Sequence, residues 1–168
     1  AILSLGGICL TRSLRGGGAE LDAAIIDYLH SRHKMLIGRR SAERIKYMLG
    51  DACTQGGASI PIEVKGRSLV SGLPTAIRLA PADFREVIDR HAQHIVDVIL
   101  EVLTQTPPEL SNDILGEGIV LTGGGAATPA LRAKIAAGTG LRVTIAEEPR
   151  LCVARGLLSL LSAGSTAN

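Results

Sequence analysis

The stretch Ile119-Val120-Leu121-Thr122-Gly123-Gly124-Gly125-Ala126 is the segment from which the rest of the chain can be interpreted. Its first three residues are apolar and two of them are β-branched, which predicts a buried strand. Three glycines follow, and because glycine has no Cβ, a ring or phosphate of another molecule can approach the backbone closely. Thr128 and Pro129 then suit the N-cap and first position of a helix. A strand, a glycine turn and a helix N-terminus together indicate a nucleotide site, since a helix start attracts anions.

The glycine run lacks the marks of two familiar phosphate-binding loops. It has neither the spaced glycines of the dinucleotide fingerprint nor the Lys-Ser or Lys-Thr pair that completes a P-loop. Taken alone, the stretch therefore fits two interpretations: a nucleotide-binding turn, or a tight turn with no ligand.

The composition bounds the class of protein. The 168 residues suffice for one compact domain or two small lobes with a true core. The chain has no Trp, one Phe and two Tyr, so stacking on single-stranded nucleic acid is not expected. A net charge of +2, with basic and acidic residues interspersed, likewise gives no indication of a nucleic-acid partner.

Cysteine usage and hydropathy point to a cytoplasmic protein. Cys9, Cys53 and Cys152 are widely separated, so we expect reduced, mostly buried thiols rather than a disulfide framework or a zinc site. No apolar run approaches the roughly 18 residues of a membrane-spanning helix. The sequence starts at Ala1 without Met, and we expect that an upstream part has been removed.

The first part of the chain alternates between strand and helix patterns. Residues 1–5 and 8–14 are β-prone runs separated by Gly6-Gly7, which predicts a hairpin. Helical periodicity begins at Glu20, directly after a second glycine run at residues 16–18.

Ser41 is expected to open a helix whose buried stripe includes Ala42, Ile45, Met48, Leu49 and Ala52. Glu43, Lys46 and Tyr47 stand at i, i+3 and i+4, so they share the opposite face of this helix. An ordinary solvated Glu43–Lys46 ion pair is the alternative to a binding role for this face.

The remaining elements follow from the same periodicities. Residues 59–65, with Ile60, Ile62 and Val64 inward, and residues 75–79 are expected as strands of a small sheet. Pro81 starts the longest helix, which carries His91 on its apolar stripe and stops at Thr106-Pro107-Pro108. We expect further helices over 129–137 and 149–161, a strand over 141–146 and a frayed tail over 162–168. The main sheet is expected to contain residues 2–5, 8–14, 119–122 and 141–145.

The sequence gives little indication of a catalytic site or a metal site. His30 with His33, and His91 with His94, have a spacing that can hold a metal, but no third ligand stands at a comparable spacing, so surface or core histidines are favoured. No serine lies in a nucleophile-elbow pattern, and no paired carboxylates suggest acid–base chemistry. We assign no catalytic residue and no metal ligand.

Short blocks along the whole chain resemble one family. From the N-terminus they are Gly7-Ile8, Arg15-Gly16-Gly17, Leu21-Asp22-Ala23-Ala24-Ile25-Ile26, Leu36-Ile37-Gly38, Ser41-Ala42-Glu43-Arg44-Ile45-Lys46, Val64-Lys65-Gly66-Arg67, Ser71-Gly72-Leu73-Pro74, Thr106-Pro107-Pro108-Glu109-Leu110, residues 118–126, and Ala146-Glu147-Glu148-Pro149 with Cys152-Val153-Ala154. In this order they resemble the second half of the MreB/Mbl family, the bacterial cell-shape actins.

This resemblance implies an α/β fold. The chain would be the second lobe of the actin-like ATPase (ribonuclease H-like) fold, with a mixed sheet, helices and an inserted small α+β subdomain. The larger subdomain would comprise residues 1–18 and 86–168, and the smaller one would be the insert, residues 19–85.

The resemblance also implies a nucleotide site. The glycine turn would pack against adenosine, while Glu43 and Lys46 would reach the ribose hydroxyls and the purine from the other side. The implied cofactor-binding residues are Gly17, Gly18, Glu43, Lys46, Gly123, Gly124, Gly125 and Ala126. The implied cofactors are ATP and, in the complete protein, Mg²⁺.

The chain also departs from the family. The phosphate loops and the catalytic acid of these ATPases do not occur in the 168 residues, so whether the chain is an enzyme is left open. Ala127-Thr128-Pro129 looks more like the chaperone branch of the fold than like the bulkier sequence usual in cell-shape actins.

The implied function is that of an actin-like cytoskeletal protein. Such a protein self-associates into ATP-dependent filaments that direct rod shape and cell-wall synthesis, in the cytoplasm at the inner membrane, together with the cell-wall elongation machinery and without nucleic acid. One alternative is a chaperone-like or sugar-kinase-like ATPase lobe of the same fold, against which the 71–74 and 106–108 blocks argue. Another is a ligand-free interaction module, if the chain is naturally truncated.

Overall fold

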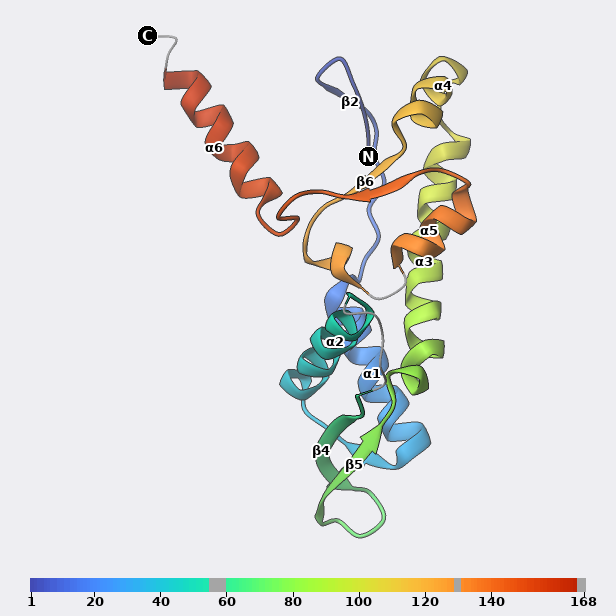
Figure 1. Cartoon of the computed structure of the whole chain (residues 1–168), viewed down its shortest axis with the longest axis vertical. Helices are drawn as coiled ribbons and strands as arrows, with labels where there is room; N and C mark the ends of the chain where they lie inside the picture. Colours follow the sequence, from blue (N-terminus) through green and yellow to red (C-terminus); the bar gives the residue numbers. More distant parts are fainter. Residues whose placement is uncertain (55–59, 129–130, 166–168) are drawn as a thin grey trace.

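The computed structural model describes residues 1–54, 60–128 and 131–165 of the chain. In chain order its elements are β1 (Ile2–Ser4), β2 (Gly7–Leu10), α1 (Gly18–His33), β3 (Met35–Leu36), α2 (Arg39–Thr54), β4 (Ile62–Ser68), β5 (Pro74–Leu79), η1 (Pro81–Phe84), α3 (Arg85–Thr104), α4 (Pro108–Glu117), β6 (Ile119–Leu121), η2 (Gly124–Ala127), α5 (Leu131–Thr139), β7 (Val143–Ile145) and α6 (Cys152–Ser165), where η marks short 3₁₀ helices. Figure 1 shows an elongated molecule from which α6 projects to one side.

Two separate strand pairs replace the single main sheet that the sequence predicts, whereas the predicted small sheet is present as β4 and β5, with β3 added. β1 and β2 form an antiparallel hairpin, β3-β4-β5 an antiparallel sheet, and β6 and β7 a parallel pair. Among the described residues no ladder joins the hairpin to β6, so the expectation of one sheet is wrong. Alternating apolar residues predict that a segment is extended, but they do not specify which strand edges pair.

The first core lies in the lower part of Figure 1, between the β3-β4-β5 sheet and helices α1 and α2. Alternate residues of β4 point into it, and Ile62 and Val64 are almost fully buried. The helices contribute side chains at helical spacing, among them Leu21, Ile25 and Leu29. Phe84 is fully buried where the chain leaves β5 for α3.

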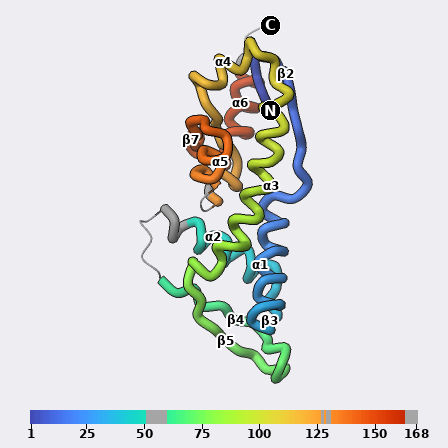
Figure 2. The backbone as a smooth tube through the Cα atoms, turned by 90° about the vertical axis from the view of Figure 1, so that its right-hand side faces the viewer, coloured from blue at the N-terminus to red at the C-terminus, as the bar shows by residue number. Residues whose placement is uncertain are grey.

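The second core lies in the upper part and is smaller. Ala92 and Val96 of α3 pack with Leu131 and Ile135 of α5 and with Val143 of β7. Figure 2 shows α3 running from the lower part of the molecule, beside α1, to the upper part. The division into residues 1–18 with 86–168 and the insert 19–85 stays a prediction, although the two cores meet on α3 close to the expected boundary.

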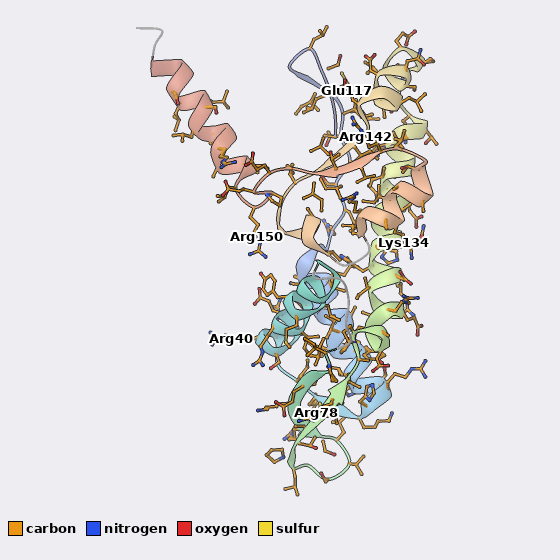
Figure 3. The ribbon with its side chains drawn as sticks, in the orientation of Figure 1. Arg40, Arg78, Glu117, Lys134, Arg142 and Arg150 are labelled. Atoms are coloured by element: carbon orange, nitrogen blue, oxygen red, sulfur yellow. The ribbon has the colours of Figure 1, made fainter. Side chains whose placement is uncertain are left out.

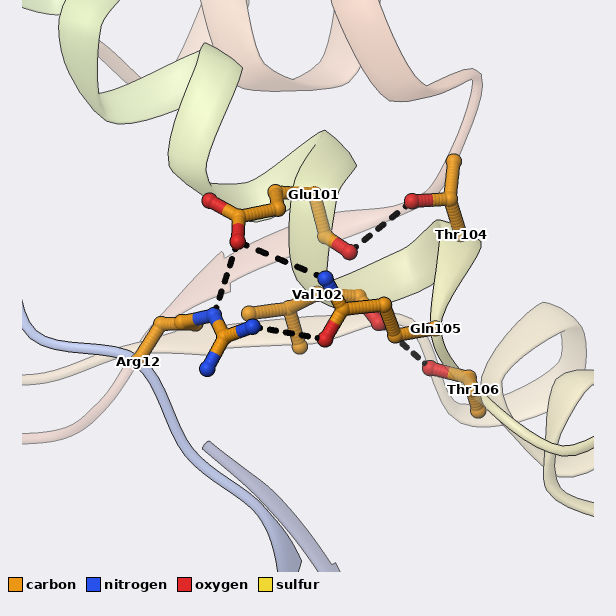
Figure 4. Close-up of polar contacts among 6 residues, drawn as sticks. All are labelled: Arg12, Glu101, Val102, Thr104, Gln105 and Thr106. Atoms are coloured by element: carbon orange, nitrogen blue, oxygen red, sulfur yellow. Dashed lines mark hydrogen bonds and ion pairs between the residues drawn. The ribbon is translucent and has the colours of Figure 1, made fainter.

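A polar network fastens the segment after β2 to α3 (Figure 4). The Arg12 guanidinium donates from Nε to Glu101 Oε1 at 2.8 Å and from a terminal nitrogen to Gln105 Oε1 at 2.8 Å. The Gln105 amide donates back to Glu101 at 3.3 Å. These bonds hold the segment between β2 and α1 against the C-terminal end of α3.

Several local predictions need correction. β2 ends at Leu10 rather than at residue 14, and the two turn residues are Leu5 and Gly6, both with positive φ, as a tight two-residue hairpin turn requires. Ile60 is 75% exposed because Pro61, which cannot donate to the ladder, delays the start of the strand. Cys9 is exposed, contrary to the expectation of buried thiols, because both sides of the hairpin lie open.

Two elements were not expected. The pair Pro107-Pro108 ends α3, as predicted, but Pro108 is also the first residue of α4, where its missing N–H costs nothing. The short β3 pairs with β4 at Ser68 and Arg67.

Within the described ranges, no helix is both long and apolar enough to span a bilayer. The side chains of Ala52, of the predicted α2 stripe, and of Cys53, predicted as a buried thiol, lie outside the part of the chain that the structure describes, as does Pro129.

Candidate functional site

The glycine turn leaves the carboxyl end of β6 at the parallel pair with β7. Gly123 has a φ of 81° and donates its N–H to the Pro149 carbonyl at 2.7 Å. A side chain would be strained at this φ, which accounts for glycine there. Gly124 then begins η2, so a turn of 3₁₀ helix follows the strand before α5 (Leu131–Thr139).

This turn faces open space, as a ligand-contacting backbone should. A Cβ built on Gly123 or on Gly125 would meet no heavy atom within 4 Å. Ala126, in contrast, is 4% exposed, so the end of the turn packs into the protein interior. The geometry leaves room for a flat ring or a phosphate against residues 123–125.

A second glycine turn opens α1. Gly17 has a φ of 86°, and its carbonyl accepts the N–H groups of Glu20 at 3.1 Å and Leu21 at 3.2 Å. A Cβ on Gly17 would also meet no atom within 4 Å, whereas one on Gly18 would stand 3.2 Å from Lys46 Nζ. The start of α1 therefore contacts α2 directly through the Lys46 side chain.

Lys46 does not pair with Glu43 as an ordinary solvated helix pair. Its ammonium lies 2.8 Å from Asp22 Oδ1 and donates to the Gly18 carbonyl at 3.1 Å. The Glu43 side chain is exposed. The two residues that the sequence groups together thus differ, because Lys46 bends toward α1 and Glu43 points to solvent.

Tyr47 and Arg150 connect α2 to the glycine turn. The Arg150 guanidinium carbon stands 5.2 Å from the centre of the Tyr47 ring, a cation–π distance. Arg150 Nε also lies 3.9 Å from the position that a Cβ on Gly124 would occupy. Figure 3 shows Arg150 reaching from the loop after β7 toward α2. Glu43 precedes Tyr47 by four residues and shares its helix face.

A charged cluster lies at the junction of the two cores. It comprises Glu20 and Asp22 of α1, Lys46 of α2, and His91 and His94 of α3. Burial lowers the pKa of His91 below its ordinary value of 6.5; the Glu20 carboxylate opposes this, while His94 and Lys46 reinforce it. Glu20 Oε2 and Asp22 Oδ1 are buried atoms with no hydrogen-bond partner among the described residues.

A groove lies next to this charged cluster. This groove of about 390 Å³ between α1 and α3 is lined by residues that include Tyr28, Arg90 and His91. None of the described side chains of α2 or of the glycine turn borders it, so we do not place the nucleotide there. Across the described residues, no group of three or more His, Cys, Asp or Glu side chains is arranged to hold a metal ion.

Sequence reasoning missed Asp22 and Arg150 as neighbours of the candidate site. Asp22 is one of several polar residues in the first turns of an amphipathic helix, and nothing in the sequence around it indicates burial. Arg150 is far from Tyr47 in sequence, and no local pattern indicates their contact. Of the expected site residues, the structure brings Gly18 and Lys46 into contact, and Arg150 lies between Tyr47 of the same helix and Gly124.

Known proteins match this chain in sequence. A model of the MreB/Mbl protein family matches residues 1–167. The cell shape-determining protein MreB of Escherichia coli K12 is 41% identical over 156 residues, which cover 93% of this chain and 45% of that protein. The cell shape-determining protein Mbl of Bacillus cereus is 38% identical over 156 residues, 93% of this chain and 46% of Mbl. The chain thus spans about half the length of these relatives.

Solved structures agree. MreB5 of Spiroplasma citri bound to AMPPNP superposes with a TM-score of 0.90 and 29% identity, over 97% of this chain and 49% of that one. The MamK double helical filament gives a TM-score of 0.70 at 19% identity, over 89% of this chain and 45% of that one, which supports the fold alone. These matches confirm the expected actin-like α/β ATPase fold and argue against a chaperone-like or sugar-kinase-like lobe. The chain belongs to the MreB/Mbl family.

Proposed function

We propose that this chain is the nucleotide-binding lobe of an actin-like cytoskeletal protein. Adenosine is held between residues 123–126 and the face of α2 that carries Glu43 and Lys46, with Gly17 and Gly18 alongside. The observation that supports this most directly is the position of Arg150, which stacks on Tyr47 of α2 and lies beside Gly124 of the open turn. The related MreB5 of Spiroplasma citri, solved with AMPPNP and with ADP, supports the ligand class.

The residues present suit the adenosine end of the ligand better than its phosphate end. The glycine turn is open to a ring, and Glu43 offers a carboxylate that can accept hydrogen bonds from sugar hydroxyls. The 168 residues contain no phosphate loop of the kind expected from the resemblance. Phosphoryl transfer depends almost entirely on such positioning and charge, so we assign no catalytic residue and no ATP turnover to this chain.

In the whole protein we place this lobe in filaments. ATP with Mg²⁺, bound with the help of parts beyond these residues, would drive self-association into filaments that direct rod shape and cell-wall synthesis. We place the protein in the cytoplasm, peripheral to the inner membrane, next to the cell-wall elongation machinery. Membership of a family with cell shape-determining relatives supports this wider role.

Replacing Glu43 by Ala tests the nucleotide site. Glu43 is exposed and lies off the apolar stripe of α2. The free energy of unfolding of the variant should therefore lie within about 0.5 kcal/mol of that of the parent. ADP binding, measured by isothermal titration calorimetry, should weaken by about 1 to 3 kcal/mol, the usual cost of losing a charge-assisted hydrogen bond.

Glu63→Ala is the matched control. Glu63 is an exposed glutamate on β4 that pairs with Lys65, so it has the same charge as Glu43 but does not lie on the α2 face. This variant should bind ADP as the parent does. Equal affinities of all three proteins would remove Glu43 from the site, and a parent that binds neither ADP nor AMPPNP would favour the ligand-free interaction module.

A further inference from the structure

The Lys46 ammonium is held in place by the first turns of α1. It stands 2.8 Å from Asp22 Oδ1 and 3.1 Å from the Gly18 carbonyl oxygen, to which it donates. The side chains of Lys46 and Asp22 are only 16% and 12% exposed. A lysine ammonium has three N–H donors, and since the Gly18 carbonyl accepts one of them, donors remain for another group.

The contact with Asp22 is a charge pairing rather than an aligned hydrogen bond. Although the two atoms are at hydrogen-bond distance, Asp22 Oδ1 has no hydrogen-bond partner within the described ranges. The approach is therefore too oblique for a hydrogen bond. A buried ion pair with incomplete hydrogen bonding is weak evidence for stability, because desolvation offsets its attraction. Stabilising the contact between α1 and α2 therefore does not explain why this ion pair is present.

The place where the ammonium is held suggests that reason. Gly18, on one side, belongs to the glycine turn that opens α1. On the other side the ammonium is 5.5 Å from the centre of the Tyr47 ring, which Arg150 covers next to Gly124. Lys46 is thus fixed at the first glycine turn of the proposed nucleotide site, on the side of Tyr47 and Arg150, which lead to the second.

We propose that Asp22 is a positioning residue, which holds the Lys46 ammonium ready for an acceptor atom on the purine nucleotide. This inference rests on the proposed function, since it needs a nucleotide at this site. Ordering a lysine side chain costs entropy, and when folding has already fixed the side chain, binding no longer bears that cost. Asp22 acts through Lys46 and does not itself touch the ligand.

A double-mutant cycle separates positioning from a structural role. ADP binding is measured by calorimetry for the parent, Asp22→Asn, Lys46→Met and the double variant. Asp22→Asn should weaken binding roughly fivefold or more when Lys46 is present, and should change it less than about twofold in the Lys46→Met background, because contacting residues couple and distant ones do not. A loss of the same size in both backgrounds, or no loss in either, overturns the proposal.

Two further variants serve as controls. Asp27→Asn makes the same charge change at an exposed position of α1 and should bind ADP as the parent does. Asp22→Glu keeps the carboxylate and should recover most of the affinity that Asp22→Asn loses. If the glutamate variant binds no better than the asparagine variant, charge pairing is not the cause and the proposal fails.

Chemical labelling reports on Lys46 without any nucleotide. Acetylation by acetic anhydride, followed by mass spectrometry, should be slow at Lys46 relative to Lys65, whose side chain is 75% exposed. Asp22→Asn should raise the rate at Lys46 and leave that at Lys65 unchanged. An unchanged rate at Lys46 contradicts the positioning role, whereas a parent that binds no ADP refutes the proposed function and, with it, this inference.

Discussion

The two cores differ in how completely the chain covers them. In the first core, helices α1 and α2 pack on the β3-β4-β5 sheet, and Leu29 and Ile25 are fully buried. In the second core, α3 and α5 cover only part of the β6-β7 pair, and Val120 of β6 remains 61% exposed. The nearby hairpin and α6 also expose apolar residues, including Leu3 and Leu157.

This difference bears on stability. Stability comes mainly from apolar surface removed from water, so the first core should hold together on its own, while the second should be marginal. Contiguous exposed apolar surface is rare on isolated domains. The candidate site lies where the two regions meet, with its α2 face on the well-packed side and its glycine turn on the open side.

Truncation of the first core should give the largest effect. Phe84 is fully buried and its ring lies 5.3 Å from that of Tyr28, so Phe84→Ala should destabilise the first core by about 3 to 5 kcal/mol. Both tyrosines of the chain, Tyr28 and Tyr47, are in the expected insert, and there is no Trp. Tyrosine fluorescence during urea unfolding therefore follows this region alone.

Leu157→Ala is the comparison on the open side. Leu157 is 58% exposed on α6, and its truncation should change the unfolding free energy by less than about 0.5 kcal/mol. If Phe84→Ala shifts the fluorescence and the far-UV circular dichroism transitions together, the two cores unfold as one unit. That result would break the contrast drawn between them.

The junction should show a smaller, pH-dependent effect. Burial lowers the pKa of His91 in the folded chain below its ordinary value of 6.5, against the opposing charge of Glu20. The unfolded chain therefore takes up the proton first as the pH falls. The stability contributed by neutral His91 is fully present above pH 6.5 and is lost as the pH falls from there toward the lowered pKa.

His91→Gln should remove this part of the pH dependence, measured as urea midpoints between pH 7.5 and pH 5. His30→Gln is the matched control, because His30 is an exposed histidine on α1. That variant should keep the parental pH dependence. If the two variants have the same pH profile, His91 is not the group that titrates at the junction.

Much of the fold could be predicted because it depends on local patterns. Period-two and helical alternation placed most strands and helices of the insert, since each element buries one face against its neighbours. Pairing between distant strands could not be predicted, because the hairpin and β6 have similar apolar patterns and nothing in them selects a partner. α4 was missed because Pro108 can end one helix and begin the next.

The glycine turns of the candidate site could be predicted from the sequence, but its tertiary contacts could not. The glycines at 17 and 123 occupy positive-φ positions, as glycine turns suggest. The approach of α2 to the turn was expected only from the family resemblance, because helical spacing cannot say what a face meets. The Lys46–Asp22 pairing and the Tyr47–Arg150 contact depend on tertiary packing, so no sequence signal preceded them.

Titration of the ¹⁵N-labelled chain with ADP tests the central claim most directly. The claim is that one ligand contacts both the glycine turn and α2. We predict saturable shifts of the amide signals of residues 123–125 and 43–47, with one common dissociation constant. The amide of Val70, at the tip of the β4–β5 hairpin, should not move. Shifts confined to the α1–α3 groove, or to the turn without α2, would contradict the account.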